Sequence, residues 1–189
     1  EVMSIGKTYK EAFQKAIRSL ETGRYGLGFA KDFSGKTKEE LILMLAEPSS
    51  ERQFIMYEAL KKGATVDELY NLTYIKKWFI EQMKELADLE AEIISYAGKT
   101  LLGEVLVKAK LDGFSDKYIA KLTGSDENAV RQQRTALGVT EDWEMVPVSA
   151  VGGNEGYFFS TYNKADKNRG TKDIDGKKVM ILGSGPNRI

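Results

Sequence analysis

The sequence predicts an all-α fold, a multi-helix domain with short extended segments near its C-terminus. Three features support this prediction. Ser or Thr recurs three positions before Glu or Gln, apolar residues recur at helical spacing after these pairs, and glycines end the periodic runs. Because the connections between the predicted helices are short, we expect one helical body from about residue 37 to residue 138.

Capping boxes mark the starts of the first four predicted helices. The capping pairs are Thr8 with Glu11, Thr37 with Glu40, Ser50 with Gln53, and Thr65 with Glu68. After these caps, helices are expected over 9–20, 38–46, 51–62 and 66–71. The second of them contains the unbroken apolar run Leu41–Ala46, so we expect it to be buried on all sides.

A long helix is predicted next, from Ile75 to Tyr96, and Gly98 should end it. Its inner side is expected to carry Ile75, Phe79, Met83, Leu86, Ile93 and Ile94. The shorter helices that should follow are Thr100–Leu111, Asp116–Leu122 and Asp126–Leu137.

The composition changes after Gly138. Val146–Val148 and Tyr157–Tyr162 are expected to be extended, with a turn at Gly152–Asn154 between them. Residues 164–178 are polar and lack periodicity, which predicts a linker.

The last residues resemble the start of an α/β unit. Val179–Leu182 is expected to be a strand, and Gly183-Ser184-Gly185 follows it as a glycine turn, which can let a backbone approach a phosphate. The third glycine of the dinucleotide-binding pattern is replaced by Arg188, so the turn is a weak binding site. Both ends of the chain look cut, which suggests a piece of a longer protein.

The composition excludes several kinds of catalytic site. The 189 residues include 28 Lys and Arg against 28 Asp and Glu, with no His and no Cys. Nucleophile systems built on His or Cys, thiolate redox chemistry and ordinary zinc sites are therefore excluded. Carboxylates could still bind Mg²⁺ or Ca²⁺, and Lys, Tyr or Asp could act as an acid or base.

Charge and hydropathy limit the partners. A net charge of zero gives no general attraction to nucleic acid or to anionic lipid. No apolar run approaches the ~18 residues that a membrane span requires. No basic segment followed by an apolar one marks a signal peptide. We therefore expect a cytoplasmic protein without a membrane partner.

The span Ser115–Gly138 follows the helix-turn-helix plan. Its steric features are Ala120 at the helix contact, Gly124 in the turn and Val130 on the second helix; its candidate base-reading side chains are Arg131, Gln132 and Arg134. Acidic residues open the second helix and would meet phosphates, which favours a packed helical hairpin. A nucleic-acid-binding domain remains the alternative function.

Two further clusters have an ordinary structural explanation. Tyr74, Trp78 and Phe79 beside Lys76 and Lys77 could stack on single strands, but burial in the core or at an interface is commoner. A carboxylate row on the long helix could suggest a di-metal bundle, but such sites need His; the row is Glu81, Glu85, Asp88 and Glu92. We interpret this row as a solvated face.

Several motifs, in order along the chain, resemble the carbamoyl phosphate synthetase large subunit family. The motifs are Glu1–Gly6 with Tyr9–Ala16, Leu72–Phe79, Gly113–Asp116 through Ala136–Gly138, Tyr157–Asn163, and Lys177–Ile189. They cover almost the whole chain, although residues 148–155 depart from the family's usual run.

The resemblance implies a division of the chain. Residues 1–21 would end the first (carboxyphosphate) synthetase domain, 22–163 would form the helical oligomerization domain, 164–178 would be a linker, and 179–189 would begin the second (carbamoyl phosphate) synthetase domain. The parent would be a ligase making carbamoyl phosphate from bicarbonate, glutamine-derived ammonia and two ATP, for arginine and pyrimidine synthesis.

The resemblance also implies that this segment is not the catalytic part. ATP and Mg²⁺ or Mn²⁺ would bind in the parent's ATP-grasp domains, so no catalytic, cofactor-binding or metal-ligating residue is assigned here. The implied partners are the flanking synthetase domains, a second copy of the chain and the parent's glutaminase small subunit. The expected function is a non-catalytic interdomain and oligomerization module.

Overall fold

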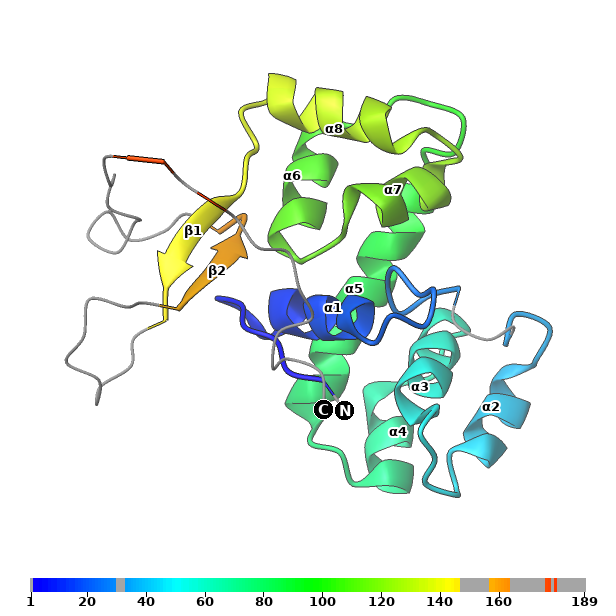
Figure 1. Cartoon of the computed structure of the whole chain (residues 1–189). Coiled ribbons are helices and arrows are strands. Elements are labelled where there is room, and N and C mark those ends of the chain that lie inside the picture. The colour runs from blue at the N-terminus through cyan, green and yellow to red at the C-terminus, as the bar shows by residue number, and fades with distance from the viewer. Residues whose placement is uncertain (1, 30–32, 147–156, 164–175, 178, 180–189) are drawn as a thin grey trace.

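The computed structural model describes residues 2–29, 33–146, 157–163, 176–177 and 179. Within these ranges the chain forms a helical body with a two-stranded antiparallel sheet at one side (Figure 1). The elements are α1 (Tyr9–Ser19), α2 (Lys38–Met44), α3 (Arg52–Lys61), α4 (Val66–Thr73), α5 (Lys77–Ile94), α6 (Gly103–Leu111), α7 (Asp116–Thr123), α8 (Glu127–Ala136), β1 (Asp142–Met145) and β2 (Phe158–Thr161). The predicted fold class is confirmed. No helix of the described residues is long and apolar enough to cross a membrane.

The predicted caps explain where several helices begin. Complete capping boxes are present at Thr37 with Glu40 and at Thr65 with Glu68, so α2 and α4 begin as predicted. The hydroxyl of Thr8 caps α1 by accepting the N–H of Glu11. The carboxylate of Glu11, however, accepts the N–H of Lys7 instead of closing a box.

The capping box predicted at Ser50 is wrong. The N-cap of α3 is Glu51, which makes no side-chain capping hydrogen bond. Its backbone is already in the right-handed helical region, and the preceding turn is closed by the N–H of Arg52 on the carbonyl of Ser49. The backbone turn leads directly into the helix, so the Ser50 hydroxyl does not open it.

Helix α5 runs through the centre of the helical body (Figure 1). It packs against α1, α3, α4, α6 and α7. Its fully buried apolar residues are Ile80, Met83, Leu86, Leu89 and Ile93. The prediction was right for Met83, Leu86 and Ile93, but wrong for Phe79 and Ile94, which are 39% and 38% exposed. Ile75, the first residue of the predicted inner side, precedes α5 and is partly buried against the core, whereas the fully buried stripe starts at Ile80.

Other helix bounds differ modestly from the prediction. Helix α5 begins two residues later than expected, because Tyr74 ends α4 in the left-handed conformation, with φ 55°. Helix α6 begins at Gly103 rather than at Thr100. Its N-cap residue is Leu102, whose apolar side chain makes no capping hydrogen bond.

The prediction that the second helix is buried on all sides is wrong. Leu41 and Leu45 are fully buried, but Leu43 is 74% exposed. Helix α2 lies at the edge of the body and packs on α3, so one face contacts the core and the other faces outward. An apolar run cannot reveal which of its faces is covered.

The sheet at the side of the body is a β-hairpin in which Asp142 pairs with Thr161 and Met145 pairs with Phe158. The second extended segment was predicted correctly, whereas the first begins at Asp142 and ends before the predicted Val146–Val148. Val146 still donates its N–H to the carbonyl of Tyr157 at 2.8 Å.

Several predictions concern residues outside the described ranges. They are Pro147 and Val148, the turn at Gly152–Asn154, the linker apart from Gly176 and Lys177, and the segment 180–189 with the Gly183-Ser184-Gly185 turn. Val179 is described, is 84% exposed and is not assigned to a strand.

Candidate functional site

The N-terminal segment, helix α1 and the hairpin meet at one side of the body. Residues 2–7 lie along the first turns of α1, where the Ser4 hydroxyl donates to the carbonyl of Ala12 at 2.6 Å. The approach is close, because a Cβ on Gly6 would lie 2.8 Å from the Ala12 nitrogen. The segment that leads into the helical body is therefore held against its first helix.

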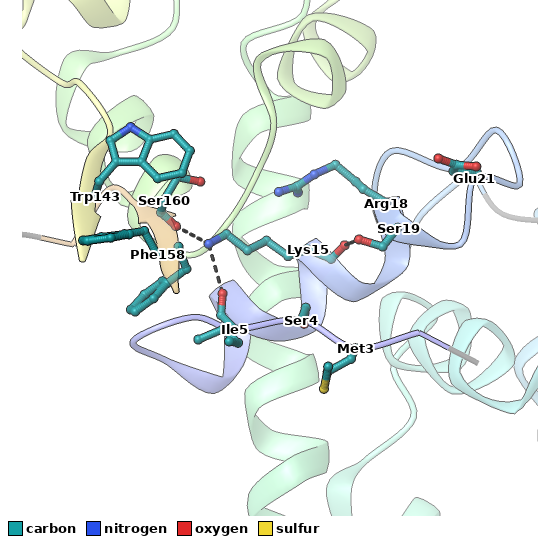
Figure 2. Close-up of a pocket in the computed structure, with 11 residues that line it drawn as sticks. Met3, Ser4, Ile5, Lys15, Arg18, Ser19, Glu21, Trp143, Phe158 and Ser160 are labelled. Atoms are coloured by element: carbon teal, nitrogen blue, oxygen red, sulfur yellow. Dashed lines mark hydrogen bonds between the residues drawn. The ribbon is translucent and has the colours of Figure 1, made fainter. Parts of the chain in front are cut away.

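Charged side chains fasten the hairpin to this segment. Lys7 Nζ lies 2.9 Å from Glu144 Oε2, and the Glu144 side chain is buried. Lys15 extends from α1 and donates to the carbonyls of Ser160 in β2 and Ile5 in the N-terminal segment, as Figure 2 shows. Burial lowers the pKa of Lys15, with a smaller contribution from the neighbouring Arg18. One ammonium group thus joins three separate segments.

A cavity of about 550 Å³ lies between α1, the N-terminal segment and the hairpin. Its apolar lining includes Met3, Ile5, Trp143 and Phe158, and Figure 2 shows Lys15 and Arg18 on its α1 side. These apolar side chains are partly exposed, at the meeting point of two chain segments far apart in sequence. The lining also includes polar and charged side chains, among them Lys15, Arg18 and Glu21.

The end of the hairpin returns to the first helix. The Asn163 side-chain amide donates to Glu11 Oε2 at 3.1 Å and to the carbonyl of Leu111 at 3.2 Å. Glu11 and Asn163 are 152 positions apart in sequence. The incoming segment (residues 2–19) and the outgoing segment (residues 157–163) are therefore bonded to each other and to α6.

A buried ion-pair network centred on Asp116 adjoins this junction, because Lys110 of the network lies against the ring of Tyr162. Asp116 accepts from Lys110 Nζ at 2.6 Å and from Arg134 Nε at 2.8 Å. Burial raises the pKa of Asp116, but these two hydrogen bonds outweigh burial and hold the pKa below its ordinary value. Arg134 also lies 3.6 Å from Glu141, which accepts the hydroxyl of Tyr162 at 3.1 Å. Helices α6, α7 and α8 are thus connected to the hairpin through paired charges.

A second buried network surrounds Glu90 in the middle of α5. Its carboxylate accepts the hydroxyls of Tyr57 at 2.7 Å and Tyr118 at 2.5 Å, and Lys61 Nζ lies 2.8 Å away. Burial, together with the Glu90 charge, raises the pKa of both tyrosines well above the ordinary value, so they remain donors. Sequence reasoning missed this residue, although its place between Leu86 and Ile93 on the apolar stripe was a usable signal.

The helix-turn-helix geometry is present, but its predicted base-reading set is not assembled. Gly124 joins α7 to α8 with φ 69°, and Ala120 and Val130 are buried at the helix contact. Arg134 points into the Asp116 network and is buried. Arg131 and Gln132 are exposed, and Arg131 lies 3.6 Å from Glu127. The arrangement is that of a packed helical hairpin.

The aromatic residues near the start of α5 are on the surface. Tyr74 is 80% exposed and Trp78 is 50% exposed, so the core explanation is wrong for them and the interface explanation remains. Lys77 lies 2.5 Å from Asp67 and above the ring of Tyr70, and Lys76 is exposed.

The carboxylate row on α5 is a solvated face, as predicted. All four residues, Glu81, Glu85, Asp88 and Glu92, are exposed. Two of them pair with lysines, Glu85 with Lys10 at 2.9 Å and Asp88 with Lys84 at 2.5 Å. Over the described part of the chain, no group of three or more acidic side chains is arranged to hold a metal ion.

Comparisons with known proteins identify the family. The family described as "Carbamoyl-phosphate synthetase large chain, oligomerisation domain" matches residues 1–138. The chain is 42% identical to a carbamoyl phosphate synthase large chain of Archaeoglobus fulgidus and 38% identical to one of Synechocystis. It is 40% identical to an arginine-specific, chloroplastic large chain of Arabidopsis thaliana.

Each match covers the whole of this chain but only 18%, 18% and 16% of those relatives, in the same order. The similarity therefore concerns one segment of a much longer protein. By its match over residues 1–138, the chain belongs to the oligomerisation-domain family of the carbamoyl-phosphate synthetase large chain.

Proposed function

We propose that this chain is a non-catalytic interdomain and self-association module of a carbamoyl phosphate synthetase large subunit. The parent would be an ATP-dependent ligase that uses bicarbonate, glutamine-derived ammonia and two ATP, with ATP and Mg²⁺ or Mn²⁺ bound in its flanking ATP-grasp domains. A glutaminase small subunit would supply the ammonia. The family match and the whole-chain similarity to large chains support this proposal.

The observation that carries the interdomain role is the junction between the incoming and outgoing segments. Asn163 bonds to Glu11, and Lys15 bonds to the carbonyl of Ser160. Since the incoming segment would be the end of the first synthetase domain and the outgoing segment would lead through the linker to the second, this junction would keep the two domains in a fixed relation. Charged and amide contacts suit this role because they are directional.

A surface for self-association is offered by α2. Leu43 is strongly exposed on a helix whose other face is buried, and Ile42 and Met44 beside it are half-buried. In Figure 1, α2 lies at the opposite edge of the body from the hairpin. A second copy docked there would leave the junction free for the flanking domains.

Self-association is tested by Leu43→Glu. A charge placed in an apolar contact should weaken association of the chain by about ten-fold or more, which corresponds to ~1.4 kcal/mol. Sedimentation velocity over a concentration series measures this. Leu102→Glu is the matched control, because Leu102 is also an exposed leucine, at the start of α6. A monomeric wild type, or an equal effect of both substitutions, would contradict the α2 surface.

The non-catalytic role has a direct test. Incubation of the chain with ATP, bicarbonate and ammonia should yield no carbamoyl phosphate above a protein-free control. Measurable synthesis that depends on the chain would overturn this part of the proposal.

A further inference from the structure

A second cavity, of about 300 Å³, lies where α1, α6, α7, α8 and the hairpin come together. Its lining is rich in basic side chains that come from different helices. They are Lys15 and Arg18 of α1, Lys110 of α6, and Arg131 and Arg134 of α8. We call this space the basic cavity. Its volume is at the lower end of the range for small-molecule sites, so it suits a ligand of few atoms.

The carboxylates of the basic cavity are shared between cations. Asp116 accepts from Lys110 at 2.6 Å and from Arg134 at 2.8 Å, so one negative charge faces two positive ones. Glu141 lies 3.6 Å from the same Arg134, and its side chain is 46% exposed. Solvent therefore screens this second pair, and it adds little to the neutralisation of the two buried cations.

The cavity as a whole keeps an excess of positive charge. Glu11 lies 3.4 Å from Lys15, but its other oxygen accepts the amide of Asn163. Burial lowers the pKa of Lys15, Arg18 and Lys110, and the positive charge of Arg18 lowers the pKa of both lysines further. The carboxylates of the cavity therefore compensate these three cations only in part.

Arg18 and Arg131 are the guanidinium groups of the cavity with the weaker internal pairing. Arg18 donates to the neutral carbonyl of Gly113 at 2.7 Å and forms no ion pair with a carboxylate of the described residues. Arg131 lies 3.6 Å from Glu127 and 3.9 Å from Asp116, which is longer than a hydrogen bond, and its side chain is 56% exposed. Both groups can therefore donate to a ligand without breaking a hydrogen bond to a carboxylate.

We propose that the basic cavity binds a small oxyanion, held between Arg18 and Arg131. A guanidinium presents two parallel N–H groups that match the oxygens of a carboxylate or of a phosphate group. An anion between them would also balance the positive charge that the carboxylates of the cavity leave uncompensated. The proposal goes beyond the proposed function and does not depend on it.

A bound anion would strengthen the junction between the incoming and outgoing segments. Arg18 belongs to the incoming segment, whereas Ser160 and Tyr162 of the outgoing segment line the same cavity. Figure 2 shows the Arg18 side chain extending from α1 toward the side on which Ser160 lies. The anion would thus connect α1 to α8 beside the outgoing segment.

Nuclear magnetic resonance titration of the ¹⁵N-labelled chain tests the proposal. Sodium phosphate and sodium acetate are added in separate series, and sodium chloride keeps the ionic strength constant. We expect saturable shifts of the backbone amides of Gly113, Ser115 and Arg131, and the anion with the lower Kd shows whether a phosphate or a carboxylate group fits better. The proposal is overturned if neither anion saturates these shifts, or if sodium chloride alone produces the same shifts.

Arg131→Gln should raise the Kd of the anion by about ten-fold or more, because it removes charged hydrogen-bond donors. Its exposed side chain makes no hydrogen bond to a carboxylate, so we expect the variant to fold. Lys108→Gln is the matched control, since Lys108 is exposed on α6 and does not line the cavity. It removes the same charge and should leave the Kd within about two-fold of the wild type. Equal effects of the two substitutions would show a general attraction of anions and would overturn the site.

Hydrogen–deuterium exchange tests the effect on the junction. With the tighter-binding of the two anions at about ten times its Kd, the amides of β2 should exchange about ten-fold more slowly, because opening of the hairpin must release the anion. Arg131→Gln should show little slowing at the same concentration. If the anion saturates the wild type and β2 exchanges at an unchanged rate, the link between the site and the junction is overturned.

Discussion

Gly28 shows how tightly single residues are constrained around Glu90. A Cβ at this position would lie 2.4 Å from the Tyr118 hydroxyl and 2.6 Å from both carboxylate oxygens of Glu90. The loop that contains Gly28 thereby covers the buried carboxylate. A side chain at this position would push the Tyr118 hydroxyl away from the Glu90 carboxylate, and the hydrogen bond between them compensates for the burial of the Glu90 charge.

Gly28→Ala should lower the free energy of unfolding by about 2 kcal/mol, because the added methyl group overpacks the Glu90 network. Urea unfolding followed by circular dichroism measures the change. Gly35→Ala is the control, since a Cβ there meets nothing within 4 Å, and its effect should stay within ~0.5 kcal/mol. Equal effects of the two substitutions would show that the close approach at Gly28 is not limiting.

Asp116→Asn should be among the more destabilising single changes in the chain, with a loss of about 3 kcal/mol. The amide cannot neutralise Lys110 and Arg134, which are both buried. Asp88→Asn removes a carboxylate from an exposed pair with Lys84 and should cost less than ~0.5 kcal/mol. Thermal unfolding of both variants at neutral pH tests the contrast, and similar melting temperatures would contradict it.

At the scale of elements, capping explains the helix starts that the sequence revealed. The box at Thr65 and Glu68 combines a hydroxyl that accepts the Glu68 N–H at 3.1 Å with a carboxylate that accepts the Thr65 N–H at 2.7 Å. The hydrogen bond from Lys38 and that from the Thr65 backbone lower the pKa of Glu68 from 4.5 to about 2. The same carboxylate therefore joins α4 to α2.

This pKa predicts how the stability contribution of Glu68 depends on pH. Because the folded-state pKa lies below the unfolded value, the stabilisation is complete above about pH 4.5 and is lost as the pH falls toward 2. The melting temperature of Glu68→Gln should therefore lie below that of the wild type at pH 6, and the difference should shrink by about pH 3.

Glu92→Gln, on the exposed face of α5, is the control. Its melting temperature should differ little from that of the wild type between pH 6 and about pH 3. If the difference in melting temperature between the wild type and Glu68→Gln were the same at pH 6 and at about pH 3, the proposed ionic contribution of the capping box would be contradicted.

Local sequence signals located elements well where the signal was itself local. The caps at Thr37, Thr65 and Ser115 depend on atoms within three residues, so the starts of α2, α4 and α7 could be predicted. The outward position of Leu43 could not, because it depends on where α3 lies. The start of β1 was missed for a similar reason, since its register is set by β2, more than ten residues away.

At the scale of the whole molecule, polar contacts join the hairpin to the helices, and among the described residues none of those in β1 or β2 belongs to the buried apolar core. Lys7, Lys15 and Asn163 each connect segments that are distant in sequence. Such contacts are specific in direction but individually modest in free energy. We therefore expect the hairpin to separate from the body before the helices unfold.

The double substitution Lys15→Ala with Asn163→Ala tests this expectation by hydrogen–deuterium exchange. Amides of β1 and β2 should exchange faster than in the wild type, whereas amides in the centre of α5 should keep their protection. Lys84→Ala, which removes an exposed pair on α5, is the control and should leave both regions unchanged. Uniform loss of protection across α5 would instead show that the junction is part of the core.

The sequence by itself determined the helical fold class, the positions of most helix starts and the family, because caps, periodicity and ordered motifs are properties of neighbouring residues. Only the tertiary structure decided which apolar residues remain uncovered and that Glu11 meets Asn163 across 152 positions. Burial and long-range bonding depend on how helices pack in space, and no local pattern encodes that arrangement.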